Sequence, residues 1–426
     1  MNGSALFDPA DFSPTGGPLR VSWPNWASPL GTWVIKGMAL LGISESKNAF
    51  SDGSLNGVAW VVTTINPDNE HRETSQTSFL DEAISEDTGL KVYTHALAKR
   101  IIFNSNKTAT GVLVETAGQS YVLEARKEVI LSAGVLQSPQ LLLVSGVGPR
   151  DTLEKLNISV VSELPGVGKN MEDHTIATIT YRVKVLTSSK SANEPAFAAM
   201  AAEAYLKNAS GPLTSPTGPL AFEKLPVEAR KGLSESTIST LARYPADWPE
   251  VEYLVVDGIP TAPDPRDGFN YGTVAVGLIA AESRGTVSIN STNTADPPVI
   301  DLGYLTAPSD VEVLLAGFKR ARQIWQQMRD ITIGSEYLPG SNITSDSDII
   351  NYIRGVLRPI FHASSTCAMG KAGDRMAVID SRARVFGVQG LRVVDISSFP
   401  FLVPGHPQAT IYMLAEKIAD DIQPRR

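Results

Sequence analysis

The segment that most constrains the fold of this chain lies near its C-terminus, at residues 391–422. A short apolar run is followed by Asp395, a proline-rich loop, and a stretch in which apolar residues recur every three or four positions. That spacing predicts a helix with one buried face, and Pro407 suits the first helical position because no N–H is needed there. We therefore expect a strand, a loop and a helix. His406 should stand directly before a helix N-terminus that carries free N–H groups and partial positive charge.

A second loop histidine, His362, lies in the sequence FHASSTCAMG at residues 361–370 and follows a helix predicted over residues 346–357. The chain has 5 histidines, and both His362 and His406 have proline, glycine or serine close by. Loops carry a large share of functional residues. Spacing alone leaves two interpretations open: a histidine pair with a shared role, or two imidazoles with no connection.

Several long stretches of the sequence resemble one enzyme family. Toward the C-terminus they are HxxxTCxMG from His362 onward, VIDSRARVFGVQGLRVVD, and PGHPQATIYMLAEKIAD. In the centre they are EVILSAGVLQSPQLLLVSGVGP at residues 128–149 and LPGVGKNMEDH at residues 164–174. In this order they resemble the signatures of the glucose–methanol–choline (GMC) flavin oxidoreductases, in particular the fungal aryl-alcohol-oxidase-like and secondary-metabolite branch. The resemblance extends from about residue 17 to the end of the chain.

The resemblance implies an α/β (α+β) fold, with the remnant of a doubly wound FAD-binding domain and an antiparallel-sheet substrate domain. We expect residues 1–175 to form a partial FAD-binding domain, residues 176–375 the substrate domain, and residues 376–426 the return to the FAD-binding domain. At residues 128–146, a strand, a small-residue turn and a helix that starts at Ser138 suggest a nucleotide-binding half unit. The alternative is an ordinary packing joint between a strand and a helix.

The strongest cofactor motif of the family, a GxGxxG turn between a strand and a helix, does not occur in the sequence. The glycines at residues 166–168 are no substitute, because they follow a proline, lack the third glycine and open no predicted helix. We therefore expect either a partial product of a longer enzyme, such as a truncated gene model, or a degenerate member. The intact remaining motifs favour the first.

By resemblance, His362 is the general base for an alcohol hydroxyl, and His406 positions the substrate oxygen. An imidazole suits the first role because its unperturbed pKa lies near neutrality. FAD supplies the hydride acceptor, which no side chain can provide. The helix after His406 is expected to direct its N–H groups at the flavin and to stabilise the anionic reduced form. His174, at the end of the central motif, is expected to be structural.

Further site residues are carried over from the family by position. The expected FAD contacts are Ala98 (through its backbone), Asp395, Ile396 and Gln408, and the expected oxygen-proximal pair is Arg384 and Val385. Asp395 could instead cap the end of its strand. No metal site is expected, and the single cysteine, Cys367, is expected to be a small buried hydrophobe.

Together these features predict FAD-dependent oxidation of a small-molecule alcohol to a carbonyl in fungal secondary metabolism, with dioxygen or another acceptor reoxidising the flavin. Two alternatives stay open. One is a non-redox lyase or cyclase on the same fold, and the other is a flavin-free truncated pseudoenzyme. The sequence specifies neither the substrate nor the oligomeric state.

Composition limits the partners and bears on location. The net charge of -8 argues against nucleic acid or an anionic membrane surface as partner, and no apolar run is long enough to span a bilayer. The first residues lack the features of a signal peptide. N-x-S/T sequons nevertheless suggest passage through the secretory pathway. Their asparagines are Asn2, Asn106, Asn157, Asn208, Asn290 and Asn342.

Overall fold

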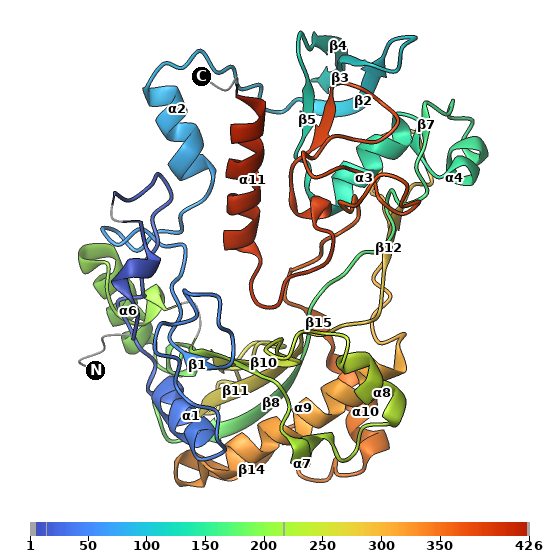
Figure 1. Cartoon of the computed structure of the whole chain (residues 1–426). Coiled ribbons are helices and arrows are strands. Elements are labelled where there is room, and N and C mark those ends of the chain that lie inside the picture. The colour runs from blue at the N-terminus through green and yellow to red at the C-terminus, as the bar shows by residue number, and fades with distance from the viewer. Residues whose placement is uncertain (1–5, 14, 216–217, 424–426) are drawn as a thin grey trace. The chain divides into compact units, whose positions relative to one another are not determined.

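The computed structural model describes residues 6–13, 15–215 and 218–423, which form two compact units (Figure 1). Unit 1 contains the chain up to Lys91 together with Thr175–Ala280 and Pro308–Arg358. Unit 2 contains Val92–His174, Ala281–Ala307 and the chain from Pro359 onward. The mixture of helices and antiparallel sheets confirms the expected fold class. The predicted division into FAD-binding and substrate domains, with borders at residues 175 and 375, stays a prediction.

An antiparallel sheet forms the centre of unit 1. In register, Val274 lies between Val255 on one neighbouring strand and Ile179 on the other, and all three are fully buried. β-Branched residues pack well on a pleated surface of this kind. The strands lie in the order β1 (Gly57–Ala59), β9 (Leu220–Glu223), β10 (Val251–Asp257), β11 (Asn270–Leu278), β8 (Thr175–Val183) and β14 (Thr332–Leu338).

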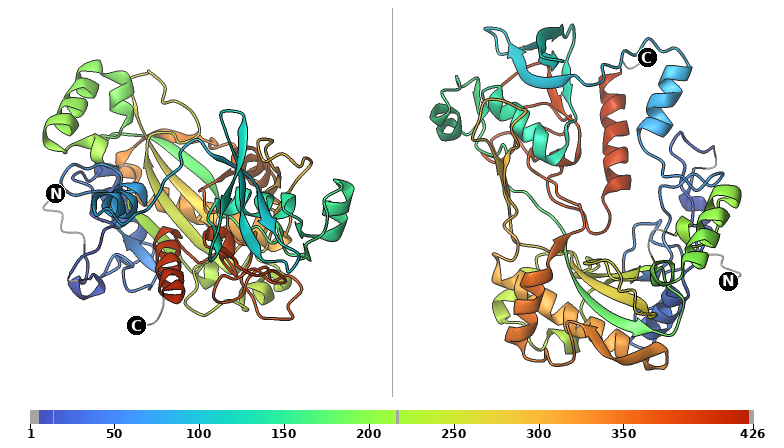
Figure 2. Two further views of the ribbon diagram at one scale, coloured as in Figure 1. Left: turned by 90° about the horizontal axis from the view of Figure 1, so that it is seen from above. Right: turned by 180° about the vertical axis from the view of Figure 1, so that it is seen from behind.

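Two helices, α1 (Pro29–Ala39) and α9 (Pro308–Gln326), pack on one face of this sheet (Figure 2). Gly272 of β11 faces both helices. A Cβ atom at this position would lie 2.7 Å from the side chain of Leu30 and 3.4 Å from that of Trp325. The glycine therefore lets both helices approach the strand closely, which closes the core on this side.

The remaining helical segments of unit 1 lie outside the sheet. The helix predicted over residues 346–357 is confirmed as α10, which starts at the predicted residue and ends one residue earlier than predicted. Among the described residues, no helix combines the length and the apolar character needed to cross a bilayer. The segments are η1 (Pro9–Asp11), η2 (Gln76–Leu80), α2 (Asp81–Ser85), α5 (Ser189–Asn193), α6 (Pro195–Asn208), η3 (Pro212–Thr214), α7 (Val227–Arg230), α8 (Glu235–Leu241), η4 (Arg329–Ile331) and α10 (Asp346–Val356).

Unit 2 is built around two parallel strands, β5 (Val129–Leu131) and β16 (Leu391–Val393). Each strand leads into a helix: α3 (Gly134–Val144) follows β5, and α11 (Gln408–Ile422) follows β16 after the proline-rich loop. Apolar side chains from these four elements meet in one buried cluster. Two parallel strands, each followed by a helix, are what a doubly wound half unit requires.

Short strands and turns complete unit 2. They are β2 (Leu97–Phe103), β3 (Ala109–Thr116) and β4 (Gln119–Glu124) in an antiparallel sheet, β6 (Val147–Gly148) parallel to β7 (Ser162–Glu163), β12 (Thr286–Ser288) antiparallel to β13 (Val299–Asp301), the helix α4 (Arg150–Lys155) and the 3₁₀ turn η5 (Ile396–Ser398). The chain passes from unit 1 to unit 2 within strand β15 (Arg358–Pro359).

Helix α3 begins at Gly134, four residues before the Ser138 start expected from the sequence, so that expectation is wrong. Pro139 lies inside the helix and has no N–H for the carbonyl of Val135. The hydroxyl of Thr366 donates to that carbonyl at 2.6 Å instead. A side chain from the HxxxTCxMG motif thus replaces the missing helical bond and fixes the motif against α3.

Helix α11 begins at Gln408, with Pro407 as its cap and not as its first residue. Of its apolar face, Ile418 is 1 % exposed, whereas Ile411 and Leu414 are half-buried. The predicted helix is confirmed. Within the described part of the chain, its apolar face is only partly covered.

Candidate active site

The loop that carries His362 is held against the end of the central motif, within unit 2. The backbone N–H of Ile360 donates to the carbonyl of His174 at 3.1 Å, and the N–H of Ser364 donates to the carbonyl of Glu172 at 2.9 Å. Between them, the N–H of His362 donates to a carboxylate oxygen of Asp173 at 3.0 Å. These bonds fix the main chain on both sides of His362, whose side chain is 7 % exposed.

The structure brings His362 and His406 together. Their ring centroids lie 4.7 Å apart, and the ring planes are inclined by 67°. His406 is exposed and directly precedes the proline that caps α11. Two imidazoles from separate loops therefore meet at one point, one buried and one accessible, as the interpretation of a histidine pair requires. Their catalytic roles stay predictions.

A third imidazole, that of His174, contacts His362 from the other side. The Nδ1 atoms of the two residues lie 3.1 Å apart, and His174 is 1 % exposed. The sequence analysis left His174 out of the site. Its place at the end of LPGVGKNMEDH was the available signal, but spacing did not show that this loop pairs with residues 360–364.

Burial controls the charge of this cluster. Burial, together with the neighbouring rings of His406 and His174, lowers the pKa of His362 from 6.5 to about 2. The imidazole of His362 is therefore neutral near pH 7 and carries a lone pair. Burial also raises the pKa of Asp173, although the Tyr304 hydroxyl donates to its carboxylate at 2.5 Å.

Asp395 ties the ends of the two parallel strands together. Its carboxylate accepts hydrogen bonds from the N–H of Gly134 at 3.0 Å, from the hydroxyl of Ser138, and from the N–H of Ser397 at 2.7 Å. It therefore caps the strand end, which was the alternative interpretation of this residue. Ile396 follows at the start of η5 and is half-buried. Contact of either residue with FAD stays a prediction.

The other expected site residues are held elsewhere in unit 2 or at its surface. Ala98 lies in β2, and its carbonyl accepts a hydrogen bond from Thr294 at 2.7 Å. Arg384 is exposed and pairs with Asp380, whereas Val385 is buried in the apolar cluster. Gln408 is exposed at the first position of α11. Their expected roles toward FAD and oxygen stay predictions.

Several features of unit 2 fit the ring end of a flavin. Strands β5 and β16 are parallel and end at the same edge, which is where α/β sheets bind ligands. Ser132 and Ala133 at this edge are exposed, and Gly134 has φ 81° and nothing within 4 Å of the position of a Cβ atom. The backbone here is accessible to a flat ring. No metal site accompanies it, because the described residues contain no group of His, Cys, Asp or Glu side chains arranged to hold a metal ion.

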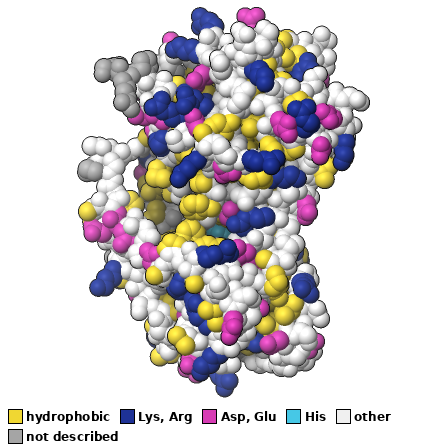
Figure 3. Space-filling view, turned by 45° about the vertical axis from the view of Figure 1, so that its right-hand side comes forward, with side chains coloured by type: hydrophobic (Ala, Val, Ile, Leu, Met, Phe, Trp, Pro, Cys, Tyr) yellow, Lys and Arg dark blue, Asp and Glu magenta, His cyan; other side chains and the backbone are white. Residues whose placement is uncertain are grey.

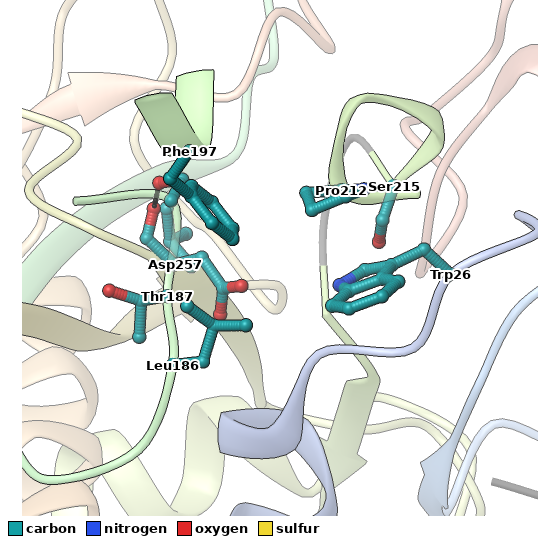
Figure 4. Close-up of a pocket in the computed structure, with 9 residues that line it drawn as sticks. Trp26, Leu186, Thr187, Phe197, Pro212, Ser215 and Asp257 are labelled. Carbon is teal, nitrogen blue, oxygen red and sulfur yellow. Dashed lines mark hydrogen bonds between the residues drawn. The ribbon is translucent and has the colours of Figure 1, made fainter. Parts of the chain in front are cut away.

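A separate cavity of about 120 Å³ lies in unit 1 (Figure 4). Trp26, Pro212 and Ser215 line one side, and Phe197 and Asp257 are on the other. None of the residues expected to form the active site lines this cavity. It is therefore a feature of the sheet unit and not part of the histidine cluster.

The Asp257 carboxylate accepts a hydrogen bond from the hydroxyl of Ser28 at 2.6 Å, and burial raises its pKa to about 6.

Elsewhere on the molecule, charged side chains of both signs are mixed. On the face in Figure 3, Lys and Arg side chains are interspersed with Asp and Glu side chains. The negative net charge is therefore not gathered into one patch on that face.

Comparison with known proteins identifies the enzyme class of this fold and site. Two models of the family described as GMC oxidoreductase match residues 4–176 and 281–415. Dehydrogenase pkfF of Emericella nidulans is 46 % identical over 99 % of this chain and 69 % of its own length. Patulin synthase of Penicillium expansum is 47 % identical over 99 % of this chain and 68 % of its own length. Versicolorin B synthase of Aspergillus parasiticus is 43 % identical over 99 % and 65 %.

Solved structures agree. An FAD-dependent oxidoreductase from Chaetomium thermophilum superimposes with a TM-score of 0.86 at 27 % identity, covering 98 % of this chain and 75 % of the other. A fungal aryl-alcohol oxidase superimposes with a TM-score of 0.80 at 25 % identity, covering 97 % and 74 %. The protein is an FAD-dependent oxidoreductase by fold, and it belongs to the GMC oxidoreductase family. The predicted family, enzyme class and cofactor are confirmed.

Proposed function

We propose that this protein oxidises an alcohol to a carbonyl, with His362 as the general base and His406 as the residue that positions the substrate oxygen. The observation that carries the proposal is the contact between a buried imidazole and an accessible one, with ring centroids 4.7 Å apart; the lowered pKa of the buried ring favours its neutral form. A neutral imidazole accepts a proton, and an accessible one reaches a substrate.

In the proposed step, the O–H bond of the alcohol breaks, its proton forms an N–H bond on His362, and the O–H electron pair becomes the second bond of the carbonyl. The carbon-bound hydrogen leaves with its electron pair, and FAD, when bound, supplies the acceptor for that hydride. Burial of His362 keeps water from competing for its lone pair, and a fixed main chain keeps the ring in place.

His406 completes the proposed site from the N-terminal end of α11. Its side chain is exposed, so it can donate a hydrogen bond to the substrate oxygen while charge develops there. The helix N–H groups behind it add partial positive charge on the same side. Dioxygen is the proposed final acceptor, which the oxidases among the similar structures support.

One experiment tests the proposal directly. In the protein with bound FAD, His362→Ala should lower turnover of an alcohol such as an aryl alcohol by about 100-fold or more, as expected for loss of a general base. His71→Ala, which removes an exposed imidazole in unit 1, is the matched control and should have no effect. Unchanged turnover by His362→Ala would overturn the proposal.

A non-redox function on the same fold is the second candidate, because the similar proteins include some that are named synthases and not oxidases or dehydrogenases. Anaerobic addition of substrate separates the two. Loss of the oxidised flavin absorbance supports oxidation, whereas product formation with a persistent yellow spectrum supports the non-redox reaction. Purified protein with no bound FAD would instead support the flavin-free alternative.

We also propose a role in fungal secondary metabolism and passage through the secretory pathway. The second point is supported by the sequons. Asn2 lies outside the described residues, and the other sequon asparagines are all exposed: Asn106, Asn157, Asn208, Asn290 and Asn342. Exposure is necessary for N-glycosylation. Treatment of protein secreted by a fungal host with peptide N-glycosidase should lower its apparent mass, and an unchanged mass would contradict the proposal.

A further inference from the structure

The rings of His174 and His362 contact each other, each through its Nδ1 atom. Their Nδ1 atoms are 3.1 Å apart, and the ring planes are inclined by 80°. Both side chains are buried. Between two neutral imidazoles a contact of this kind holds one proton, so one Nδ1 donates and the other accepts.

The direction of this hydrogen bond decides what His362 can do. If His174 donates, His362 uses its Nδ1 lone pair for the bond and carries its proton on Nε2, where it can only donate. If His362 donates, its proton is on Nδ1, and the Nε2 lone pair is available to take a proton. Only the second arrangement gives a general base.

We propose that His174 is a positioning residue that accepts the hydrogen bond from Nδ1–H of His362 and thereby sets the tautomer of the base. This inference rests on the proposed function of His362. When the substrate proton forms a bond with Nε2, His362 becomes an imidazolium with a proton on each nitrogen. The Nδ1–H then still has His174 as its acceptor, so the positive charge is stabilised where it forms.

The surroundings of His174 fit this role. Its carbonyl accepts from the N–H of Ile360, and the flanking Glu172 is paired with Ser364, so the His174 main chain is tied to the loop that carries His362. The carboxylate of Asp173 accepts from the main chain N–H of His362. Asp173 thus holds the main chain of His362, whereas the imidazole of His174 contacts its ring.

Two variants separate the role of the acceptor from that of ring volume. His174→Asn keeps an oxygen near the position of Nδ1, and His174→Phe keeps a ring without an acceptor. In the protein with bound FAD, His174→Phe should lower kcat about 10-fold or more with KM unchanged, because substrate binding does not involve His174. His174→Asn should restore kcat to within about threefold of the parent. Equal kcat in His174→Phe and the parent would overturn the inference.

A spectroscopic measurement makes the test independent of turnover. In protein labelled with ¹⁵N-histidine, the His362 signals, assigned by comparison with His362→Ala, should show the proton on Nδ1 and a lone pair on Nε2. A proton on Nε2 would overturn the inference even if His174→Phe fails to fold. Different results would contradict the proposed function of His362 and the proposed role of His174. Full activity of His362→Ala contradicts the proposed function, whereas an inactive His362→Ala beside a fully active His174→Phe contradicts only the role of His174.

Discussion

The ring of His362 lies against the ring of His406 with centroids 4.7 Å apart, although the two residues belong to different loops. Two imidazolium ions at this distance would repel each other, and burial disfavours the charge on His362 further. The pair therefore favours one neutral member, which is the buried one. This asymmetry gives the two histidines different chemistry even though their side chains are identical.

The proposed role of His406 predicts that a hydrogen-bond donor matters more than an imidazole at this position. His406→Ala should lower kcat/KM about 100-fold, whereas His406→Asn, which keeps an N–H donor, should stay within about 10-fold of the parent. Steady-state kinetics with an alcohol would measure both, and His71→Ala again serves as the control. If Ala and Asn have the same effect, donation by His406 is not what the reaction uses.

Burial of neutral His362 predicts a specific dependence of stability on pH. Its folded pKa of about 2 lies below the unfolded value of 6.5, so between these values the unfolded state binds more protons. The free energy of unfolding therefore falls as the pH falls below 6.5, by about 1 kcal/mol per pH unit from this residue.

His362→Gln removes that contribution. The difference in unfolding free energy between variant and parent, measured by urea titration, should shift in favour of the variant as the pH is lowered from 7 to 5. A difference that does not change with pH would mean that His362 is protonated in the folded protein.

For Asp257, in the cavity of unit 1, we expect the opposite dependence of stability on pH. Burial raises its pKa from 3.8 to about 6, so the folded state binds more protons between these values, and stability falls as the pH rises through them. Above pH 6 the charged carboxylate costs up to about 3 kcal/mol. Asp257→Asn keeps an acceptor for Ser28 and should be more stable than the parent at pH 7.5 but not at pH 3.5. Greater stability at both values would point to a packing effect and not to charge.

The sequence predicted those parts of the site that depend on local patterns. Apolar periodicity predicted α11 and placed His406 before it, and an apolar run with a following small-residue turn predicted β5 and its helix. The contact of His174 with His362 could not be predicted in this way, because it depends on hydrogen bonds between two loops distant in sequence.

The start of α3 was missed for a related reason. Proline inside a helix normally argues against the helix. Here the Thr366 hydroxyl, from a distant motif, supplies the hydrogen bond that Pro139 cannot make. The capping role of Asp395 likewise depends on partners in α3 that only the folded chain brings to it. Tertiary partners of single polar side chains were the information that the sequence pattern lacked.

The loop at residues 164–174, which carries His174, passes close to the main chain of Met376. A Cβ atom added at Gly166 would lie 2.0 Å from the carbonyl oxygen of Met376, which is backbone and cannot rotate away. Gly166→Ala should therefore force the loop to shift, lowering the free energy of unfolding by about 2–4 kcal/mol. Since the loop also holds His174 against His362, alcohol turnover should fall as well.

Gly118→Ala is the matched control for that substitution in the same unit. A Cβ atom there meets nothing within 4 Å, and only the positive φ of 79° opposes it, so the cost should be about 1 kcal/mol with turnover unchanged. Urea unfolding and alcohol turnover of both variants provide the test. If Gly166→Ala is no more costly than Gly118→Ala, the close approach of the loop to residue 376 does not hold in solution, and the support that it gives to the imidazole cluster is lost with it.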